Sequence, residues 1–220
     1  MFDYTFQWRV VLRHWPELLQ AGILTLQITI LSIVIGLTIA AALAVFRDSK
    51  NPILRDFAIV WIALARNTPA LLQIYMAYFG LGALGIHLSP YTSVLGAIAF
   101  NNAGYLAEIL RGGFASVPPS QKLAARGIGL NAYQAYVYVT LPQVLRAVFL
   151  PIVNQIIWAM LGTSLGMIIG LQELTGMTTF LQSQTFRPFE FYFVAACIYL
   201  VIAKIATGSA HLIAARMFKG

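Results

Sequence analysis

The feature that most constrains this chain is its series of long apolar stretches, the first of which covers residues 18–46. This stretch has about 29 residues, whereas about 20 helical residues suffice to cross the hydrocarbon core of a bilayer. It is also too long for the apolar part of a cleaved signal peptide and has no Ala-x-Ala cleavage site, so we expect it to remain as a helix. The first stretch therefore predicts a transmembrane helix that is tilted or extends beyond the bilayer.

Composition extends this conclusion to the whole chain. Hydrophobic residues make up 60% of the 220 residues and charged residues 10%, against about 25% charged residues in a typical soluble domain. We therefore predict an all-α integral membrane protein, with residues 1–220 forming a single transmembrane domain. The single cysteine, Cys197, excludes an internal disulfide and a cysteine-based metal site.

Five spans are expected from the alternation of apolar and polar stretches. The predicted spans are residues 18–46, 54–80, 91–110, 136–171 and 191–214. Pro69 is expected to kink the second span because proline lacks the backbone donor of a helix interior. Before the first span, residues 1–17 are expected to form a short interfacial helix that Pro16 ends, and residues 172–190 are expected to be polar and flexible.

The distribution of basic residues predicts the orientation in the membrane. Five spans put the two ends of the chain on opposite sides. If the loops after the first and third spans are cytoplasmic, that side holds ten of the fourteen Lys and Arg residues, as the positive-inside rule requires. These ten are Arg47, Lys50, Arg55, Arg66, Arg111, Lys122, Arg126, Arg146, Arg216 and Lys219. The N-terminus is thus expected outside and the C-terminus in the cytoplasm.

The loop at residues 111–135 is expected to contain a short helix on the cytoplasmic face of the membrane. Pro118 and Pro119 cannot continue the preceding helix, and Ser120 is a candidate cap for the next one. Residues 121–126 are good helix formers and are followed by glycines. A helix of this size can dock into a groove on another protein.

Polar side chains at membrane depth predict a path for a polar solute. Amides and hydroxyls are costly in hydrocarbon and normally face the protein interior or water. Three predicted spans carry amides or hydroxyls without a balancing charge. Neutral polar groups of this kind suit a zwitterionic solute that passes through a cavity. The candidate solute-binding residues are Asn67, Thr68, Asn101, Asn102, Asn154, Gln155, Thr163 and Ser164. Hydrogen bonding between helices is the alternative role for each residue, and Glu108 is expected to form a structural ion pair with Arg111.

Several other functions find no support in the sequence. No Gly-x4-Gly-Lys-Ser/Thr loop is present, so this chain is not expected to cradle ATP phosphates. His14, His87 and His211 lie far apart without metal-ligand spacing, and no catalytic constellation can be assembled. The net charge of +7 comes from basic residues scattered between apolar runs, which topology explains better than nucleic-acid binding.

Several motifs in unbroken order resemble the permeases of ABC importers, and in particular their polar amino acid branch. The cytoplasmic loop of that family has a Glu-Ala-Ala motif, a later glycine and a Leu-Pro, which Ala124, Ala125, Gly129 and Leu141-Pro142 match. Flanking matches are RNTPALLQ at 66–73, YLAEILRGG at 105–113, NQ at 154–155 and TSL at 163–165. The residues that the resemblance assigns to ATPase coupling are Ser120, Gln121, Ala124, Ala125, Arg126, Gly129 and Leu130.

The resemblance implies a five-helix permease of the type I importer kind, working in the bacterial cytoplasmic (inner) membrane by alternating access. It implies a second permease subunit, two cytoplasmic subunits that bind ATP and magnesium, and an extracytoplasmic solute-binding protein that delivers a polar amino acid. The permease itself would need no cofactor and would not be an enzyme.

Two departures from the family pattern bear on the partner subunit. Leu123 stands where the family has its loop glutamate, and Gly162 stands where members often have an aspartate before Thr-Ser. We therefore expect a second permease subunit that is not identical to this one. A secondary transporter or channel remains the alternative, although it would need an ion-coupling carboxylate at mid-membrane. A purely structural membrane subunit is disfavoured by the 25-residue basic loop at 111–135.

Overall fold

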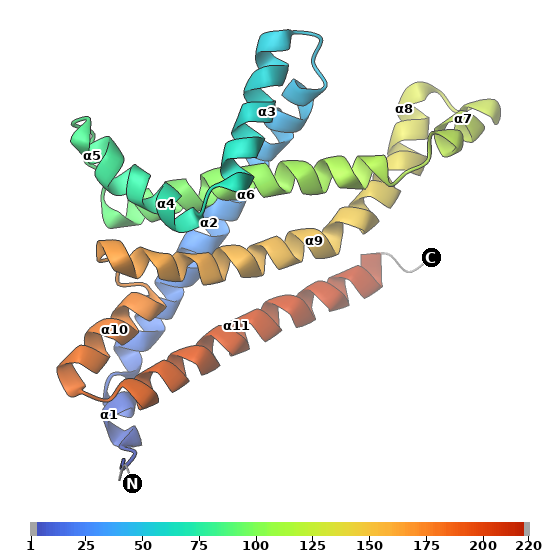
Figure 1. Ribbon diagram of the computed structural model, residues 1–220. Helices are drawn as coiled ribbons and strands as arrows, with labels where there is room; N and C mark the ends of the chain where they lie inside the picture. Colours follow the sequence, from blue (N-terminus) through green and yellow to red (C-terminus); the bar gives the residue numbers. More distant parts are fainter. Residues whose placement is uncertain (1–3, 218–220) are drawn as a thin grey trace. The chain divides into compact units, whose positions relative to one another are not determined.

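The computed structural model describes residues 4–217, and the regular secondary structure among them is all helical (Figure 1). The ends of the predicted domain at residues 1 and 220, and Lys219, lie outside the described residues. The α-helices are α1 (Trp8–Arg13), α2 (Trp15–Arg47), α3 (Pro52–Asn67), α4 (Ala70–Tyr75), α5 (Leu81–Ala83), α6 (Pro90–Ala115), α7 (Pro119–Gly127), α8 (Ala132–Ala135), α9 (Leu141–Gly162), α10 (Leu174–Thr185) and α11 (Pro188–Met217). Two π-helical segments, η1 (Met76–Gly80) and η2 (Tyr136–Thr140), and one 3₁₀ segment, η3 (Thr163–Ile169), continue neighbouring helices.

Among residues 4–217, three helical runs are long and apolar enough to cross a membrane, namely α2, the run Ala132–Ile169 and α11. The pair formed by α3 with the segment Ala70–Ala83 passes the same test only as one broken span. The break replaces the kink expected at Pro69, because Thr68 and Pro69 both lie outside the helices. Helix α6 is 26 residues long, but Asn101, Asn102 and Glu108 lower its mean hydropathy.

The structure corrects three local expectations. Pro16 does not end a helix but lies in the first turn of α2, where a missing N–H costs nothing. Ser120 does not cap α7, because Pro119 already occupies its first position and Pro118 is the N-cap residue. The segment 172–190, expected to be polar and flexible, is mostly helical: it contains α10, which Glu173 caps by accepting a hydrogen bond from Gly176 N over 2.9 Å.

The chain forms two compact units. Unit 1 comprises the chain up to Ile33, Thr68–Ala99 and Ile157–Ile205, and unit 2 comprises Val34–Asn67, Phe100–Ile156 and the chain from Ala206 onward.

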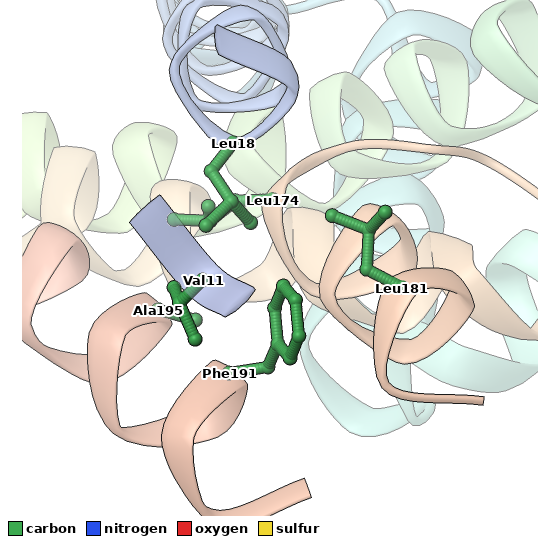
Figure 2. Close-up of a cluster of buried hydrophobic side chains, with 6 residues drawn as sticks. All are labelled: Val11, Leu18, Leu174, Leu181, Phe191 and Ala195. Carbon is green, nitrogen blue, oxygen red and sulfur yellow. The ribbon is translucent and has the colours of Figure 1, made fainter. Parts of the chain in front are cut away.

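The core of unit 1 holds α10 against the first and last helices. Figure 2 shows its six buried side chains, Val11, Leu18, Leu174, Leu181, Phe191 and Ala195, which come from α1, α2, α10 and α11. Burying a Leu or Phe side chain of this kind contributes about 1.5–3 kcal/mol. The apolar spacing at 174 and 181 therefore explains why a segment rich in Thr and Gln still folds as a helix.

Unit 2 depends on close approach between helices at two glycines of α6. A β-carbon on Gly104 would lie 2.5 Å from Ala65 Cβ of α3, and one on Gly113 would lie 2.2 Å from Val148 Cγ1 of α9. Neither position has room for a larger side chain. These contacts set α3 and α9 against α6, where the polar residues of unit 2 lie.

Candidate translocation path and docking loop

A buried pair of amides joins α6 to α9 in unit 2. Gln155 Nε2 donates to Asn102 Oδ1 over 2.9 Å, and the two residues are only 8% and 0% exposed. On the preceding residue, Asn101 Nδ2 donates to the carbonyl of Ala65 at the end of α3 over 2.9 Å. The structure thus brings three of the predicted path residues together, and their partners lie on neighbouring helices.

Two further predicted path residues of unit 2 do not join this group. Asn67 is exposed and donates through Nδ2 to Ala63 O in its own helix over 2.9 Å. Asn154 is also exposed, one position before the buried Gln155 on α9. Both amides therefore remain available at a surface of this chain.

The predicted path residues of unit 1 are hydroxyls that bond within their own segments. Gln73 Nε2 donates to Thr68 Oγ1 over 2.8 Å across the break before α4. Thr163 Oγ1 donates to Met160 O over 2.8 Å, and Ser164 Oγ donates to Leu161 O over 2.6 Å. Thr163 and Ser164 thus use their hydroxyl donors and keep oxygen lone pairs as acceptors, whereas Thr68 Oγ1 accepts the hydrogen bond from Gln73.

Apolar side chains fill the space around Gly162. A β-carbon at this position would lie 3.0 Å from Ile98 Cδ1 and 3.6 Å from the ring of Trp158. Thr163 and Ser164 follow directly in η3. The place of the family's aspartate is therefore packed by hydrocarbon and carries no charge.

A buried carboxylate in unit 1 escaped the sequence analysis. Glu173 is 0% exposed, and Tyr199 OH donates to its Oε2 over 2.8 Å while Thr25 Oγ1 does so over 3.2 Å. Its Oε1 accepts from Gly176 N, where a β-carbon would lie 1.9 Å from Leu171 O, so only glycine fits. Glu173 therefore ties α2, α10 and α11 together through neutral donors.

Glu108 is the centre of a cluster of three arginines in unit 2. The expected partner Arg111 bonds Glu108 Oε2 through Nη2 over 2.8 Å, and Arg66 Nη1 lies 3.5 Å from the same oxygen. Arg47, at the end of α2, also pairs with Glu108, whose side chain is only 16% exposed. The carboxylate thus joins α2, α3 and α6, which spacing along α6 alone did not reveal.

The predicted docking helix is present as α7, and it exposes apolar side chains. Leu123 is 71% exposed, and Ile128, directly after the helix, is 81% exposed. Ala124 and Arg126 are also exposed, whereas Ala125 is buried at 4%. Ala125 is thus on the covered side of α7, and the exposed apolar surface comes from Leu123 and Ile128.

The ends of α7 are firmly held. Gly129 has φ +95°, which favours glycine, and Leu130 N donates back to Ala125 O over 3.2 Å. At the other side of the turn, Asn131 and Gln134 form a reciprocal capping box that starts α8, with both bonds at 2.9 Å. Gln143 Nε2 on α9 donates to Gln121 Oε1 over 2.5 Å.

Within residues 4–217, no cluster of His, Cys, Asp and Glu has the composition to hold a metal ion. Several helices long enough to cross a membrane, with buried amides between them, are the features of a multi-pass membrane protein.

Comparisons with known proteins identify the family. Residues 32–219 match the family described as binding-protein-dependent transport system inner membrane component. The octopine transport system permease protein OccM of Rhizobium meliloti is 36% identical over 99% of this chain and 87% of its own length. The glutamine transport system permease protein GlnP of Escherichia coli K12 is 31% identical over 91% of this chain and 92% of its own.

Solved structures agree with this assignment. A crystal structure of an amino acid ABC transporter with histidines superposes with a TM-score of 0.90 at 30% identity, over 97% of this chain and 100% of that chain. An inward-facing structure of the MetNI methionine ABC transporter has a TM-score of 0.73 at 15% identity, over 91% and 95% of the two chains, and supports the fold alone.

The chain belongs to the family of binding-protein-dependent transport system inner membrane components. It is a multi-pass inner-membrane permease of an ABC importer, and the ATPase resides in separate subunits. Such a system also includes a solute-binding protein. The permease binds no cofactor of its own, because ATP is bound by the ATPase subunits.

Proposed function

We propose that this permease imports polar amino acids or their opine-like derivatives by alternating access, driven by the ATPase subunits. The observation that carries the proposal is the buried Asn102–Gln155 pair, which offers neutral donors and acceptors on two helices. Relatives named for octopine, nopaline and glutamine transport support this class of solute. Amides that bond one another in one state can exchange that bond for the polar groups of a zwitterion in another.

The membrane architecture that we propose has five spans in one permease domain. Helix α6 is the additional span, because Asn101 and Asn102 are buried inside the protein and do not face lipid. The polar residues lower the mean hydropathy of α6 without exposing polar groups to lipid, so a low hydropathy does not argue against α6 as a span. With five spans, the excess of Lys and Arg around α7 supports a cytoplasmic loop, an outside N-terminus and a cytoplasmic C-terminus.

The proposed path contains the polar residues of both units, although only some of them contact each other here. The buried Asn101, Asn102 and Gln155 would respond to a change of helix packing. The exposed Asn67 and Asn154 and the half-buried Ser164 and Thr68 are accessible without such a change. The proposed path residues are Asn67, Thr68, Asn101, Asn102, Asn154, Gln155, Thr163 and Ser164.

We propose α7 as the helix that docks on an ATPase subunit. The exposed Leu123 and Ile128 supply the apolar contact, and Lys122 and Arg126 flank it with positive charge. Ala125 lies on the covered side of α7. The proposed coupling set remains Ser120, Gln121, Ala124, Ala125, Arg126, Gly129 and Leu130, now with Leu123 and Ile128 added.

The second permease subunit is proposed to be non-identical to this chain. Gly162 is packed by Ile98 and Trp158, so this chain offers no acid at that position to an ammonium group. A partner with an aspartate there would supply the missing charge in a site of low dielectric constant.

Uptake by the reconstituted transporter tests the proposal. The complex, purified through a tag on this chain, is placed in proteoliposomes with its binding protein and internal ATP, and uptake of radiolabelled glutamine, arginine, histidine and octopine is measured. ATP-dependent uptake of at least one of them is expected, with maltose as the negative control. Uptake that persists without ATP would favour a secondary transporter or channel, and uptake of none of them would reject the solute class.

A further inference from the structure

Helix α2 has a second polar face, which differs from the face that contacts Glu173. Thr25 is buried at 0%, whereas Gln20 and Gln27 are exposed. Glu17, Gln20, Leu24 and Gln27 follow one another at spacings of three, four and three residues, so they share one side of the helix.

This second face lines a cavity of about 430 Å³ within unit 1. Gln172, between η3 and α10, and Met177 of α10 close the cavity from the other side. Four of its side chains are therefore polar, namely Glu17, Gln20, Gln27 and Gln172. The volume suits a ligand of the size of an amino acid.

The depth of Gln27 excludes lipid as a favourable neighbour for this face. Gln27 lies twelve residues after Trp15, which is about 18 Å along an α-helix, whereas the hydrocarbon core is about 30 Å thick. An exposed amide at that depth faces water or another polar group, because hydrocarbon would leave its hydrogen bonds unmade.

Glu17 gives the cavity a negative charge with spare capacity to accept hydrogen bonds. Its Oε1 lies 3.3 Å from His14 Nδ1, while its Oε2 has no hydrogen-bond partner among the described residues. The side chain as a whole is 44% exposed, but Oε2 itself is buried, so the carboxylate has to rotate to turn this oxygen toward a ligand. A carboxylate with three amides matches a solute that carries an ammonium group and polar acceptors.

We propose that this cavity, lined by Glu17, Gln20, Gln27 and Gln172, is an outer solute pocket that receives an ammonium-bearing solute before it reaches the buried amides. Glu17 accepts hydrogen bonds from the ammonium group, and the glutamine amides bind the solute carboxylate and side chain. The solute class and the outside location rest on the proposed function. The pocket supplies a charge that the surroundings of Gly162 lack.

Chemical labelling of introduced cysteines tests the pocket without knowledge of the solute. Cys197 is first replaced by serine, and Gln27→Cys, Gln20→Cys and the control Ile30→Cys are expressed in the intact transporter in spheroplasts. Ile30 is 59% exposed on the same helix but does not line the cavity. Charged methanethiosulfonate reagents that cannot cross the membrane are then added outside.

An outer solute pocket predicts that Gln27→Cys reacts at least tenfold faster than Ile30→Cys. At Gln20→Cys the cationic trimethylammonioethyl reagent should react faster than the anionic sulfonatoethyl reagent. Adding Glu17→Gln should lower the ratio of the two rates about sevenfold, because losing one charge about 7 Å away in water slows the cationic reagent and speeds the anionic one by ~2.7-fold each. If Gln27→Cys is unreactive in a transporter that still takes up solute, the face packs against another subunit and the proposal fails.

Protection by solute completes the test. Glutamine should slow the labelling of Gln27→Cys, whereas glutaramate, which has the same skeleton without the ammonium group, should not. The proposal of a solute pocket is rejected if the transporter takes up one of glutamine, arginine, histidine and octopine, but none of these four slows the labelling. Failure of all uptake would reject the proposed solute class, while the charge preference at Gln20→Cys would still report on the pocket itself.

Discussion

Asn102 and Gln155 are bonded to each other over 2.9 Å in the interior of unit 2, although 53 positions separate them in the sequence. A purely structural pair and a solute-binding pair predict different results in a double-mutant cycle. Asn102→Leu and Gln155→Leu should each lower the free energy of unfolding by about 1–3 kcal/mol, because each removes the hydrogen bond between two buried amides of α6 and α9. The double variant should recover part of that loss, yet its uptake should stay below a tenth of wild type.

Thermal unfolding in nanodiscs and uptake in proteoliposomes measure the two effects. Uptake that recovers together with stability in the double variant would show that the pair serves packing alone.

The exposed apolar surface of α7 should control ATPase coupling. Ile128→Ser is expected to reduce solute-stimulated ATP hydrolysis at least fivefold, because it removes about 1.5–3 kcal/mol of apolar burial from the docking contact. The membrane helices should assemble normally, since Ile128 is 81% exposed in this chain. The matched control is Ile86→Ser. Ile86 is also exposed, at 53%, but lies far from the loop in the sequence. Equal ATPase activity in the two variants would remove Ile128 from the docking surface.

The hydrogen bond from Tyr199 to Glu173 should stabilise unit 1. Tyr199→Phe is expected to lower the free energy of unfolding by about 1.5–3 kcal/mol, the usual contribution of a hydrogen bond to a charged group. Tyr138→Phe should change stability by less than about 0.5 kcal/mol, because Tyr138 is 68% exposed. Denaturation monitored by tryptophan fluorescence gives both values, and similar stability of the two variants would mean that Glu173 does not depend on Tyr199.

The thermal stability of the protein should depend more on Glu108 than on any one of the three arginines around it. Glu108→Gln leaves three guanidinium groups near one another without a counter-charge, whereas Arg111→Gln leaves two arginines still paired with Glu108. We expect the melting temperature to fall more in Glu108→Gln, and the difference between the variants to shrink in 1 M salt. A larger fall in Arg111→Gln would contradict the central role of Glu108.

Subunit composition tests the proposed second permease. A transporter purified through a tag on this chain should contain a second, different permease with an acid at the position of Gly162, as read from intact-complex mass spectrometry. Two copies of this chain with two ATPases, transporting at full rate, would show that Gly162 marks another substrate chemistry and not an unlike partner.

The sequence predicted the membrane class, the family and the short helix of the 111–135 loop, because apolar length, motif order and proline positions are local signals. The contacts of Glu108 and Glu173 could not be predicted from the sequence, because their partners lie far away along the chain. Arg47 is 61 positions from Glu108, and Thr25 is 148 positions from Glu173. Local spacing identified only Arg111, three residues from Glu108. Glu173 was assigned to a flexible segment because the helices that bury it come from elsewhere in the chain.

If α7 docks on an ATPase subunit as proposed, the hydrogen bonds at its ends determine how its movement reaches α9. The bond from Leu130 N to Ala125 O and the Asn131–Gln134 capping box leave few freely rotating residues between α7 and α9. The bond from Gln143 to Gln121 adds a second connection between the same two helices. A rigid connection between α7 and α9 deforms little when α7 moves. In the proposed docking arrangement, a displacement of α7 would therefore be passed to α9, the helix that carries Gln155.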